Sequence, residues 1–273
     1  MSATPRGGPP RPAGLAAGRV ELPGTRRCVY LRELCGADEE SVSGRDTLAA
    51  LRLLDRLLTE GPGASIRPGS AALLTATERH LLLAHVYRTA FGARIDGTVR
   101  CTGCGEPFDL DFSLDEMETN VLRRQGSVSA TADSVYPLAD GRSFRLPIGE
   151  DELAVLGLDP AAAAAQLLSR CMVQGNASPE EADVVEAMEK AGPLLDLDLQ
   201  ANCPACGLSQ AIRFSIQDYL LAALERDADR LVHEVHQLAA TYSWGLGEIL
   251  SLRRRRRQSL AELISWEPQR SHR

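Results

Sequence analysis

Two segments, VRCTGCGEPFDL (residues 99–110) and QANCPACGLSQAI (residues 200–212), share one pattern. In each, two cysteines separated by two residues are followed by a glycine, and alternating apolar and polar residues lie on both sides. Alternation predicts strands, and the glycine permits the positive φ angle of a tight turn. We therefore expect two β-hairpins, each of which presents two thiols on one side of its turn.

Four thiolates from two facing hairpins are the ligand set of a structural zinc site. The expected ligands of this Zn²⁺ are Cys101, Cys104, Cys203 and Cys206. The long segment between the pairs does not oppose a shared site, because the entropy cost of closing a loop grows slowly with its length. The alternatives are disulfide or redox chemistry, and cysteines that have been kept without a metal. A redox Cys-x-x-Cys usually begins a helix after a strand, whereas both pairs here precede strands.

Helices are expected over most of the remaining chain. The clearest one opens with a Thr75-x-x-Glu78 capping box, in which each side chain satisfies a free backbone N–H of the other residue, and it ends at Gly92. A hairpin is expected to turn at Asp140-Gly141. Tyr242 and Trp244 are expected to fill the corner after the last long helix as apolar anchors. The other expected elements are a strand at 27–34, helices at 46–61, 159–175, 178–192 and 216–241, and two short helices within 242–264.

These elements predict an α+β fold that is dominated by helices. It would contain a split zinc ribbon, made of the two Cys-x-x-Cys hairpins, with an α/β lobe inserted between its halves. The expected organisation is a disordered N-terminal tail (1–27), a helical core with the ribbon halves (28–122 and 194–266), the inserted lobe (123–193) and a frayed tail (267–273).

Composition limits the classes of function. The chain has 273 residues, 44% of them hydrophobic, and a formal net charge of −7, which argues against a general nucleic-acid coat. No stretch approaches the roughly 18 uncharged apolar residues of a membrane-spanning helix. Seven cysteines, an odd number, are not typical of a secreted disulfide framework. We expect a cytoplasmic protein without membrane insertion.

The strongly basic stretch is the run of arginines from Arg253 through Arg254, Arg255 and Arg256 to Arg257. Three interpretations remain open: a solvated face, a contact with an acidic protein partner, or a contact with RNA or DNA. Consecutive residues of a helix point all round it, so two or three arginines at most could face one partner. Residues 101–120 carry six acidic side chains and no basic one, a charge that would repel phosphates from the first cysteine pair.

No catalytic motif stands out in the sequence. A closed shell of four thiolates has no open coordination position, so it holds structure and does not activate water. His233 and His236 are spaced to share a helix face, but no carboxylate completes a His-Glu-x-x-His pattern. We interpret them, like His80 and His85, as ordinary residues of a helix surface or boundary. The expectation is a protein that is not an enzyme and has no small-molecule substrate.

Three separated pieces resemble a known family. They are LTATERHLLLAHVYRTAFGARI (74–95) with the first cysteine turn, the second cysteine turn with the helix after it, and VHEVHQLAATYSWGLGEILSLRRRRRQSLAELI (232–264). Together they are similar to baseplate proteins of contractile phage tails and phage-like contractile injection systems, and most to the T-even-type baseplate hub assembly chaperone-like proteins. The resemblance spans roughly residues 28–264. The chain departs from the family where Gly245-Leu246-Gly247 replaces a polar helix start.

The resemblance implies a non-enzymatic structural or chaperone-like assembly role in the baseplate. It also implies partners among other baseplate, hub and spike proteins, with assembly in the cytoplasm or a place in the phage-like particle. The main alternative is a zinc-ribbon nucleic-acid-binding adaptor that uses the patch Arg253–Arg257.

Overall fold

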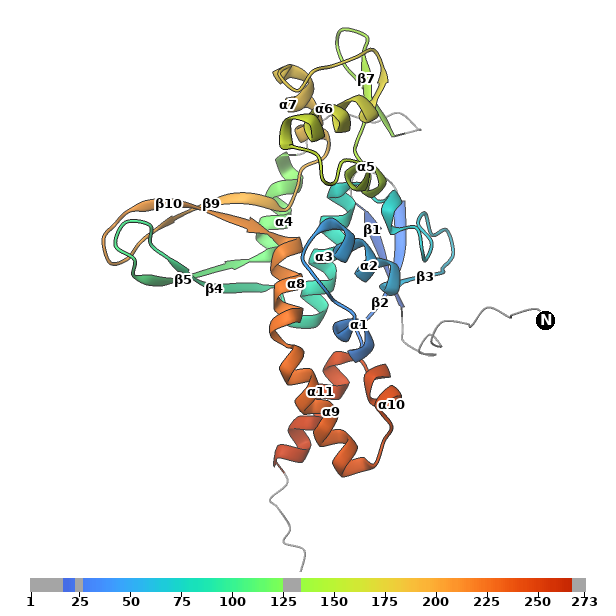
Figure 1. The fold of residues 1–273 in the computed structure, drawn as a ribbon, viewed down its shortest axis with the longest axis vertical. Helices are drawn as coiled ribbons and strands as arrows, with labels where there is room; N and C mark the ends of the chain where they lie inside the picture. Colours follow the sequence, from blue (N-terminus) through green and yellow to red (C-terminus); the bar gives the residue numbers. More distant parts are fainter. Residues whose placement is uncertain (1–16, 23–26, 125–133, 267–273) are drawn as a thin grey trace, which may run out of the picture.

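The computed structural model describes residues 17–22, 27–124 and 134–266, and its mixture of helices and strands is the predicted α+β class. Figure 1 shows a central body, a long arm that projects from it, a lobe at one end and a group of helices at the other end. The frayed tail predicted at 267–273 and the first sixteen residues of the predicted N-terminal tail lie outside the described residues.

The central body is a small antiparallel sheet packed against helices. Strand β2 pairs with β1 on one side and with β3 on the other. Leu54, Leu82 and Leu220 are fully buried in the core between these elements, and each such side chain stabilises the fold by about 1.5–3 kcal/mol. The elements of the body are β1 (Ala17–Leu22), β2 (Arg27–Arg32), α1 (Gly36–Glu40), α2 (Thr47–Leu57), β3 (Leu58–Thr59), η1 (Ala71–Leu73), α3 (Ala76–Phe91), α4 (Leu114–Arg124) and α8 (Ile216–Arg226).

Strand β1 corrects the predicted N-terminal tail. Residues 17–22 fall within the stretch 1–27 that was expected to be disordered, yet all six pair in register with β2. The prediction of disorder is wrong for these residues. It extended to them a Pro- and Gly-rich composition that is concentrated earlier in the chain. Val20 and Leu22 also pack on the core, which gives the strand apolar contacts in addition to its backbone hydrogen bonds.

Helix α2 ends four residues earlier than expected. Asp46 caps its start as predicted, where the carboxylate accepts a hydrogen bond of 2.8 Å from the backbone N–H of Ala49. Leu58, however, takes an extended conformation and pairs with β2. Gly61 is therefore not the helix end. A Cβ at Gly61 would lie 2.3 Å from the ring of Tyr30, so this glycine allows a close approach.

Helix α3 follows its prediction closely. The backbone N–H of Thr75 donates to Glu78 at 2.9 Å, the N–H of Glu78 donates to the Thr75 hydroxyl at 3.2 Å, and Gly92 ends the helix with φ of 101°. His80, expected on a surface or boundary, is buried instead, and burial lowers its pKa to about 3. Core elements pack around several sides of this helix, which is why His80 is buried and does not lie at a surface or boundary.

The lobe has its own small hydrophobic cluster, in which the rings of Tyr136 and Phe144 stack at 5.3 Å. The expected hairpin turn is present, with Gly141 at φ of 91°. The sequence prediction placed the lobe at 123–193, of which residues 125–133 lie outside the described part. Its elements are β6 (Val135–Pro137), β7 (Ser143–Arg145), α5 (Gly149–Ala154), α6 (Pro160–Cys171), β8 (Met172–Gln174) and α7 (Ala182–Ala191).

Two helices of the lobe are shorter than predicted. The helix expected over 159–175 ends at Cys171, because the next residues form β8 and pair with β7. The helix expected over 178–192 begins at Ala182. Ser178 does not cap it, since its backbone N–H donates to Glu181 at 2.9 Å within the preceding turn.

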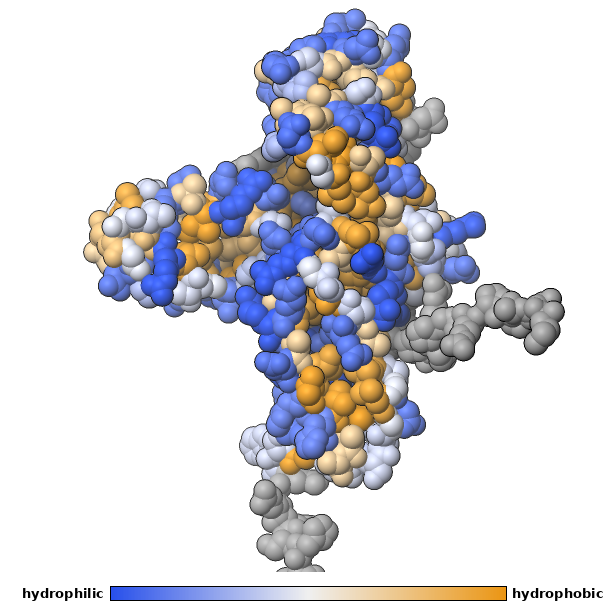
Figure 2. Space-filling view, viewed as in Figure 1, coloured by the Kyte–Doolittle hydropathy of each residue, from blue (hydrophilic) through white to orange (hydrophobic). Residues whose placement is uncertain are grey.

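The helices at the other end of the molecule are α9 (Ala228–Tyr242), α10 (Leu246–Ser251) and α11 (Arg254–Trp266). The long helix expected over 216–241 is interrupted at Asp227, which separates α8 from α9. The two short helices predicted after it are present. Tyr242 and Trp244 stack on each other at 4.9 Å but remain 39% and 37% exposed, so they do not fill a corner as expected. Figure 2 shows further apolar surface over this group of helices.

Candidate metal centre

The arm consists of the two predicted hairpins, β4 (Arg94–Arg100) with β5 (Pro107–Ser113), and β9 (Asp196–Asn202) with β10 (Ser209–Ser215). They extend side by side from the body in Figure 1. Alternate side chains of each hairpin turn toward the other hairpin, and Phe112 meets Phe214 edge to face at 5.1 Å. The intervening residues face outward and are mostly polar. The period of two that predicted the strands thus also produces the thin apolar layer that joins them.

The two Cys-x-x-Cys turns at the tip have the same backbone geometry. Gly105 and Gly207 have φ angles of 76° and 75°, values that a residue with a side chain rarely adopts. The N–H of Gly105 donates to the carbonyl of Cys101 at 2.9 Å, and the N–H of Gly207 donates to that of Cys203 at 2.8 Å. The glycine after each cysteine pair therefore has the structural role that the sequence predicted.

The four cysteines come together at the tip. Their sulfur atoms all lie within 4.8 Å of one another, and none of the four forms a disulfide. The Sγ atoms of Cys101 and Cys206 are 3.6 Å apart, and those of Cys104 and Cys203 are 3.7 Å apart. Four thiolates bound tetrahedrally with metal–sulfur bonds of about 2.3 Å would have sulfur–sulfur separations of about 3.8 Å. The cluster could hold a metal ion.

The cluster has a buried half and an exposed half. Cys101 and Cys203, the first cysteines of the two turns, are 3% and 2% exposed, whereas Cys104 and Cys206 are open to solvent. The backbone N–H groups of Cys104 and Gly103 lower the pKa of Cys101 to about 6. At Cys104, a backbone hydrogen bond is outweighed by burial and the neighbouring cysteine sulfurs, which raise the pKa to about 12, and the pKa of Cys206 is also raised. A thiol with a lowered pKa is a ready metal ligand, because the thiolate is the form that coordinates.

One polar side chain links the two turns. The side-chain oxygen of Gln210 accepts from the backbone N–H of Thr102 at 2.8 Å, and its nitrogen donates to the carbonyl of Arg100 at 3.1 Å. Gln210 belongs to one hairpin and its partners to the other, so it fixes the relative position of the turns. Sequence reasoning missed Gln210, and only the facing of the hairpins reveals its role.

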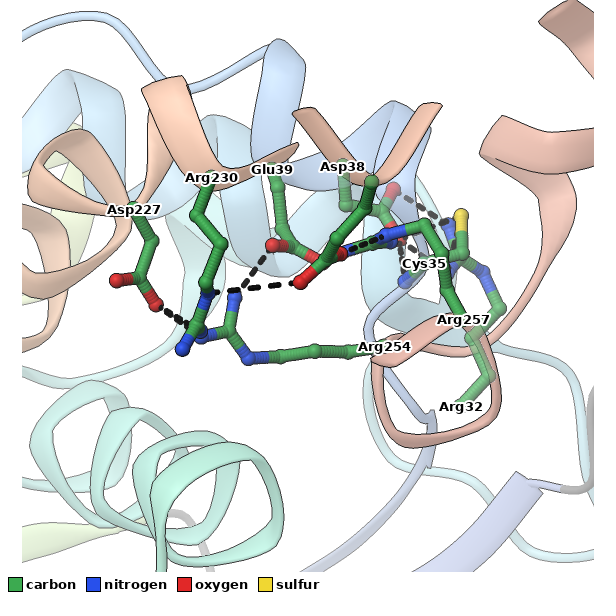
Figure 3. A network of polar contacts seen from close by, with 9 residues as sticks. Arg32, Cys35, Asp38, Glu39, Asp227, Arg230, Arg254 and Arg257 are labelled. Carbon is green, nitrogen blue, oxygen red and sulfur yellow. Dashed lines mark hydrogen bonds and ion pairs between the residues drawn. The ribbon is translucent and has the colours of Figure 1, made fainter. Parts of the chain in front are cut away.

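The five consecutive arginines do not form one patch. Arg254 and Arg257 are 3% and 1% exposed and point into the molecule, as Figure 3 shows. Arg257 binds Glu39 at 2.8 Å and Glu234 at 2.7 Å, and Arg254 binds Glu39 and Asp227. Arg254 and Arg257 are therefore removed from the five candidate partner-binding residues, because residues three apart at the start of α11 share its inward face.

The remaining three arginines are accessible. Arg255 and Arg256 are exposed, and Arg253 is partly exposed and lies 3.4 Å from Glu33. The buried pair, together with its acidic partners, joins α9 and α11 to α1. We call this group of Glu39, Asp227, Glu234, Arg254 and Arg257 the junction network.

A second carboxylate beside the junction network holds α1 to β2 and α2 of the body. Asp38 binds Arg32 at 2.5 Å and Arg56 at 3.1 Å. Burial would raise the pKa of Asp38, but the ion pair with Arg32 outweighs it and holds the pKa below its usual range. Two adjacent acidic residues, Asp38 and Glu39, thus hold different arginines, a division that the sequence alone did not indicate.

Within the described residues, the cysteine cluster is the one group of three or more His, Cys, Asp or Glu side chains that is arranged to hold a metal. His233 lies on the side of a groove between α9 and α11, and His236 is exposed on α9.

No protein family, curated protein or solved structure matches this chain. In the described parts of the chain, each helix is too short or too polar to cross a lipid bilayer.

Proposed function

We propose that the chain is a non-enzymatic structural or assembly component, with a chaperone-like role, of the baseplate of a contractile phage-tail-like injection system. Its arm is a split zinc ribbon in which Cys101, Cys104, Cys203 and Cys206 bind one structural Zn²⁺. The observation that carries the structural role is the spacing of the four sulfur atoms, which suits a closed tetrahedral shell and leaves no ligand position for a substrate.

The choice of zinc follows from the donor set. Soft thiolates in a tetrahedral arrangement are typical of zinc or iron–sulfur sites, and magnesium and calcium prefer oxygen ligands. Each cysteine pair sits in a turn between strands, and the turn glycines have positive φ angles. These features favour a single zinc ion that joins the hairpins.

The assignment to a baseplate rests on the resemblance of three sequence pieces, and their arrangement supports it. Helix α3, from the first piece, packs against α8, which follows the second cysteine turn. The third piece forms α9, α10 and α11, and the ring of Phe91 at the end of α3 lies 4.4 Å from the guanidinium of Arg254. The pieces that resemble the family therefore form one connected unit.

Tyr242 and Trp244 offer a surface for partners in that apparatus. The residues from Ala240 to Glu248 are all exposed, and Glu248 is the single charged residue among them. Half-exposed tyrosine and tryptophan side chains are frequent anchors of protein interfaces. A hub or spike protein with an apolar pocket is the expected partner of this stacked pair.

The test is recovery of tail proteins with an affinity-tagged chain from cells that produce the injection system. We expect tube, sheath, hub or spike proteins in the eluate, and we expect a Tyr242→Ala/Trp244→Ala variant to recover less of them. The matched control is Trp266→Ala, which removes another exposed aromatic ring from the same group of helices. A tagged, folded chain that recovers no tail protein would refute the proposal.

The nucleic-acid adaptor is the weaker candidate. Burial of Arg254 and Arg257 reduces its basic patch to Arg253, Arg255 and Arg256, while the chain as a whole carries a net charge of −7. It predicts salt-sensitive binding to DNA or RNA that is lost in an Arg255→Glu/Arg256→Glu variant. Such binding by the zinc-loaded chain would favour the adaptor over the baseplate component.

A further inference from the structure

The cysteine cluster has an asymmetry that a purely structural metal site does not require. One sulfur of each turn is buried and one is exposed. Two close sulfur–sulfur contacts each join an exposed cysteine to the buried cysteine of the opposite hairpin. These contacts are Cys104 with Cys203 at 3.7 Å and Cys206 with Cys101 at 3.6 Å.

We propose that the cluster is a site of oxidative modification by hydrogen peroxide, at which two disulfides between the hairpins, Cys104–Cys203 and Cys101–Cys206, replace the metal. The inference rests on the zinc site of the proposed function and adds a way in which its occupancy is regulated. Because both bonds cross from one hairpin to the other, the arm stays closed while Zn²⁺ leaves.

The chemistry begins at an exposed sulfur, which the Zn²⁺ of the proposed site would hold as a thiolate. The thiolate of Cys104 or Cys206 attacks one oxygen of hydrogen peroxide, so that a sulfur–oxygen bond forms, the oxygen–oxygen bond breaks and hydroxide leaves. The product is a sulfenic acid. Exposure selects these two cysteines, since access governs which thiolate meets the oxidant.

The buried sulfur of the opposite hairpin completes each reaction. The thiolate of Cys203 attacks the sulfur of oxidised Cys104, or that of Cys101 attacks the sulfur of oxidised Cys206. In either case the sulfur–sulfur bond forms, the sulfur–oxygen bond breaks and a second hydroxide leaves. Each disulfide reduces one peroxide by two electrons. Zn²⁺ is released because a disulfide sulfur is no longer a thiolate ligand.

Hydrogen bonds fix the geometry of the first turn, and the sulfur contacts of 3.6 and 3.7 Å run from one turn to the other. The backbone N–H of Gly103 donates to the sulfur of Cys101 at 3.3 Å, and Gly105 is held to the carbonyl of Cys101. Among the described residues, the cysteines outside the cluster, Cys28, Cys35 and Cys171, are buried and do not compete for the oxidant.

The experiment uses the full chain, purified under reducing conditions, with its zinc content measured. Hydrogen peroxide is added, zinc release is followed with a chromogenic chelator, and a non-reducing tryptic digest is analysed by mass spectrometry. Trypsin places the cysteine pairs on separate peptides, 101–123 and 191–213. We expect loss of about one Zn²⁺ per chain, a covalent link between these two peptides, and recovery of zinc binding after reduction by a dithiol.

The possible outcomes separate the two proposals. A chain without zinc refutes the zinc ribbon of the proposed function. A zinc-loaded chain that keeps its metal in peroxide, or that forms disulfides inside each peptide, refutes the inference and leaves the zinc ribbon intact.

Two double variants test the assigned pairs with equal numbers of cysteines. Cys104→Ser/Cys203→Ser keeps the exposed–buried pair Cys101 and Cys206, and should cross-link readily in peroxide. Cys104→Ser/Cys206→Ser keeps two buried sulfurs and should cross-link much more slowly. Equal rates in two variants whose circular dichroism matches the parent chain would overturn the assignment of roles. If neither folds, fragmentation of the linked peptides between Cys101 and Cys104 and between Cys203 and Cys206 decides which sulfurs are joined in the parent chain.

Discussion

Replacement of Arg257 by alanine should detach the C-terminal helices from the body. Arg257 is 1% exposed and binds two carboxylates, Glu39 and Glu234, whose side chains are 3% and 6% exposed. Removing one partner of a buried ion pair costs about 3–5 kcal/mol, because the other charge is left buried without compensation. Each carboxylate keeps a second arginine, Arg254 or Arg230, so we expect the lower end, about 3 kcal/mol.

The two tryptophans of the chain make this loss measurable. Trp244 lies between α9 and α10 and Trp266 ends α11, so tryptophan fluorescence in urea reports on the unfolding of the C-terminal helices. A loss of about 3 kcal/mol should lower the urea midpoint by roughly 1–3 M. The matched control is Arg256→Ala on the same helix, where the exposed side chain should change stability by less than about 0.5 kcal/mol. Equal midpoints for the two variants would refute the role assigned to the junction network.

Three further predictions concern other parts of the fold. Cys203→Ser should abolish binding of about one Zn²⁺ per chain in elemental analysis, and full zinc content would remove this sulfur from the site. Gly61→Ala should lower the free energy of unfolding by about 1–3 kcal/mol, measured by heat or urea, because the new Cβ meets the ring of Tyr30. Gly97→Ala, with open space around it, should cost less, and the reverse order would contradict the packing. Ion pairs with Arg145 and Arg170, which outweigh burial, lower the pKa of Asp151 from 3.8 to about 2. Its contribution is therefore fully present above about pH 4 and is lost as pH falls toward 2, so the stability difference between the parent chain and Asp151→Asn should shrink over that range. A difference that is constant with pH would rule out this ion-pair contribution.

The hairpins and the caps at Asp46, Thr75 and Asp159 were predictable because their causes are local. The period-two alternation, the glycine after each cysteine pair and the box of Thr75 with Glu78 all act within a few residues. The hypothesis of one shared site also predicted that the four cysteines would meet, and their sulfur atoms lie together. These signals identify the arm and its candidate ligands from the sequence alone.

The errors have tertiary causes. Leu58 has the spacing of a helical core residue, yet pairing with β2 draws it into a strand. The arginine run could be interpreted only as a charge cluster, because its acidic partners Glu39, Asp227 and Glu234 are far away in the sequence or on another helix. Arg254 and Arg257 are three residues apart, and this spacing alone indicated that the two side chains would lie on the same face of a helix.

The cysteine cluster lies at the free end of the arm, where it can hold the two hairpins together. Seven-residue strands extend the hairpins by about 24 Å, and the layer between them is one pair of side chains thick. Nearer the body, Phe112 and Phe214 belong to or pack against the main core, whereas the tip has the small cluster around Phe108. Separation of the hairpins should therefore spread from the tip and stop near the body. It should be observed as local exchange of the arm's amide hydrogens without unfolding of the helices. A metal bound by these cysteines would govern how far the hairpins can part, and global unfolding would record only a fraction of its effect.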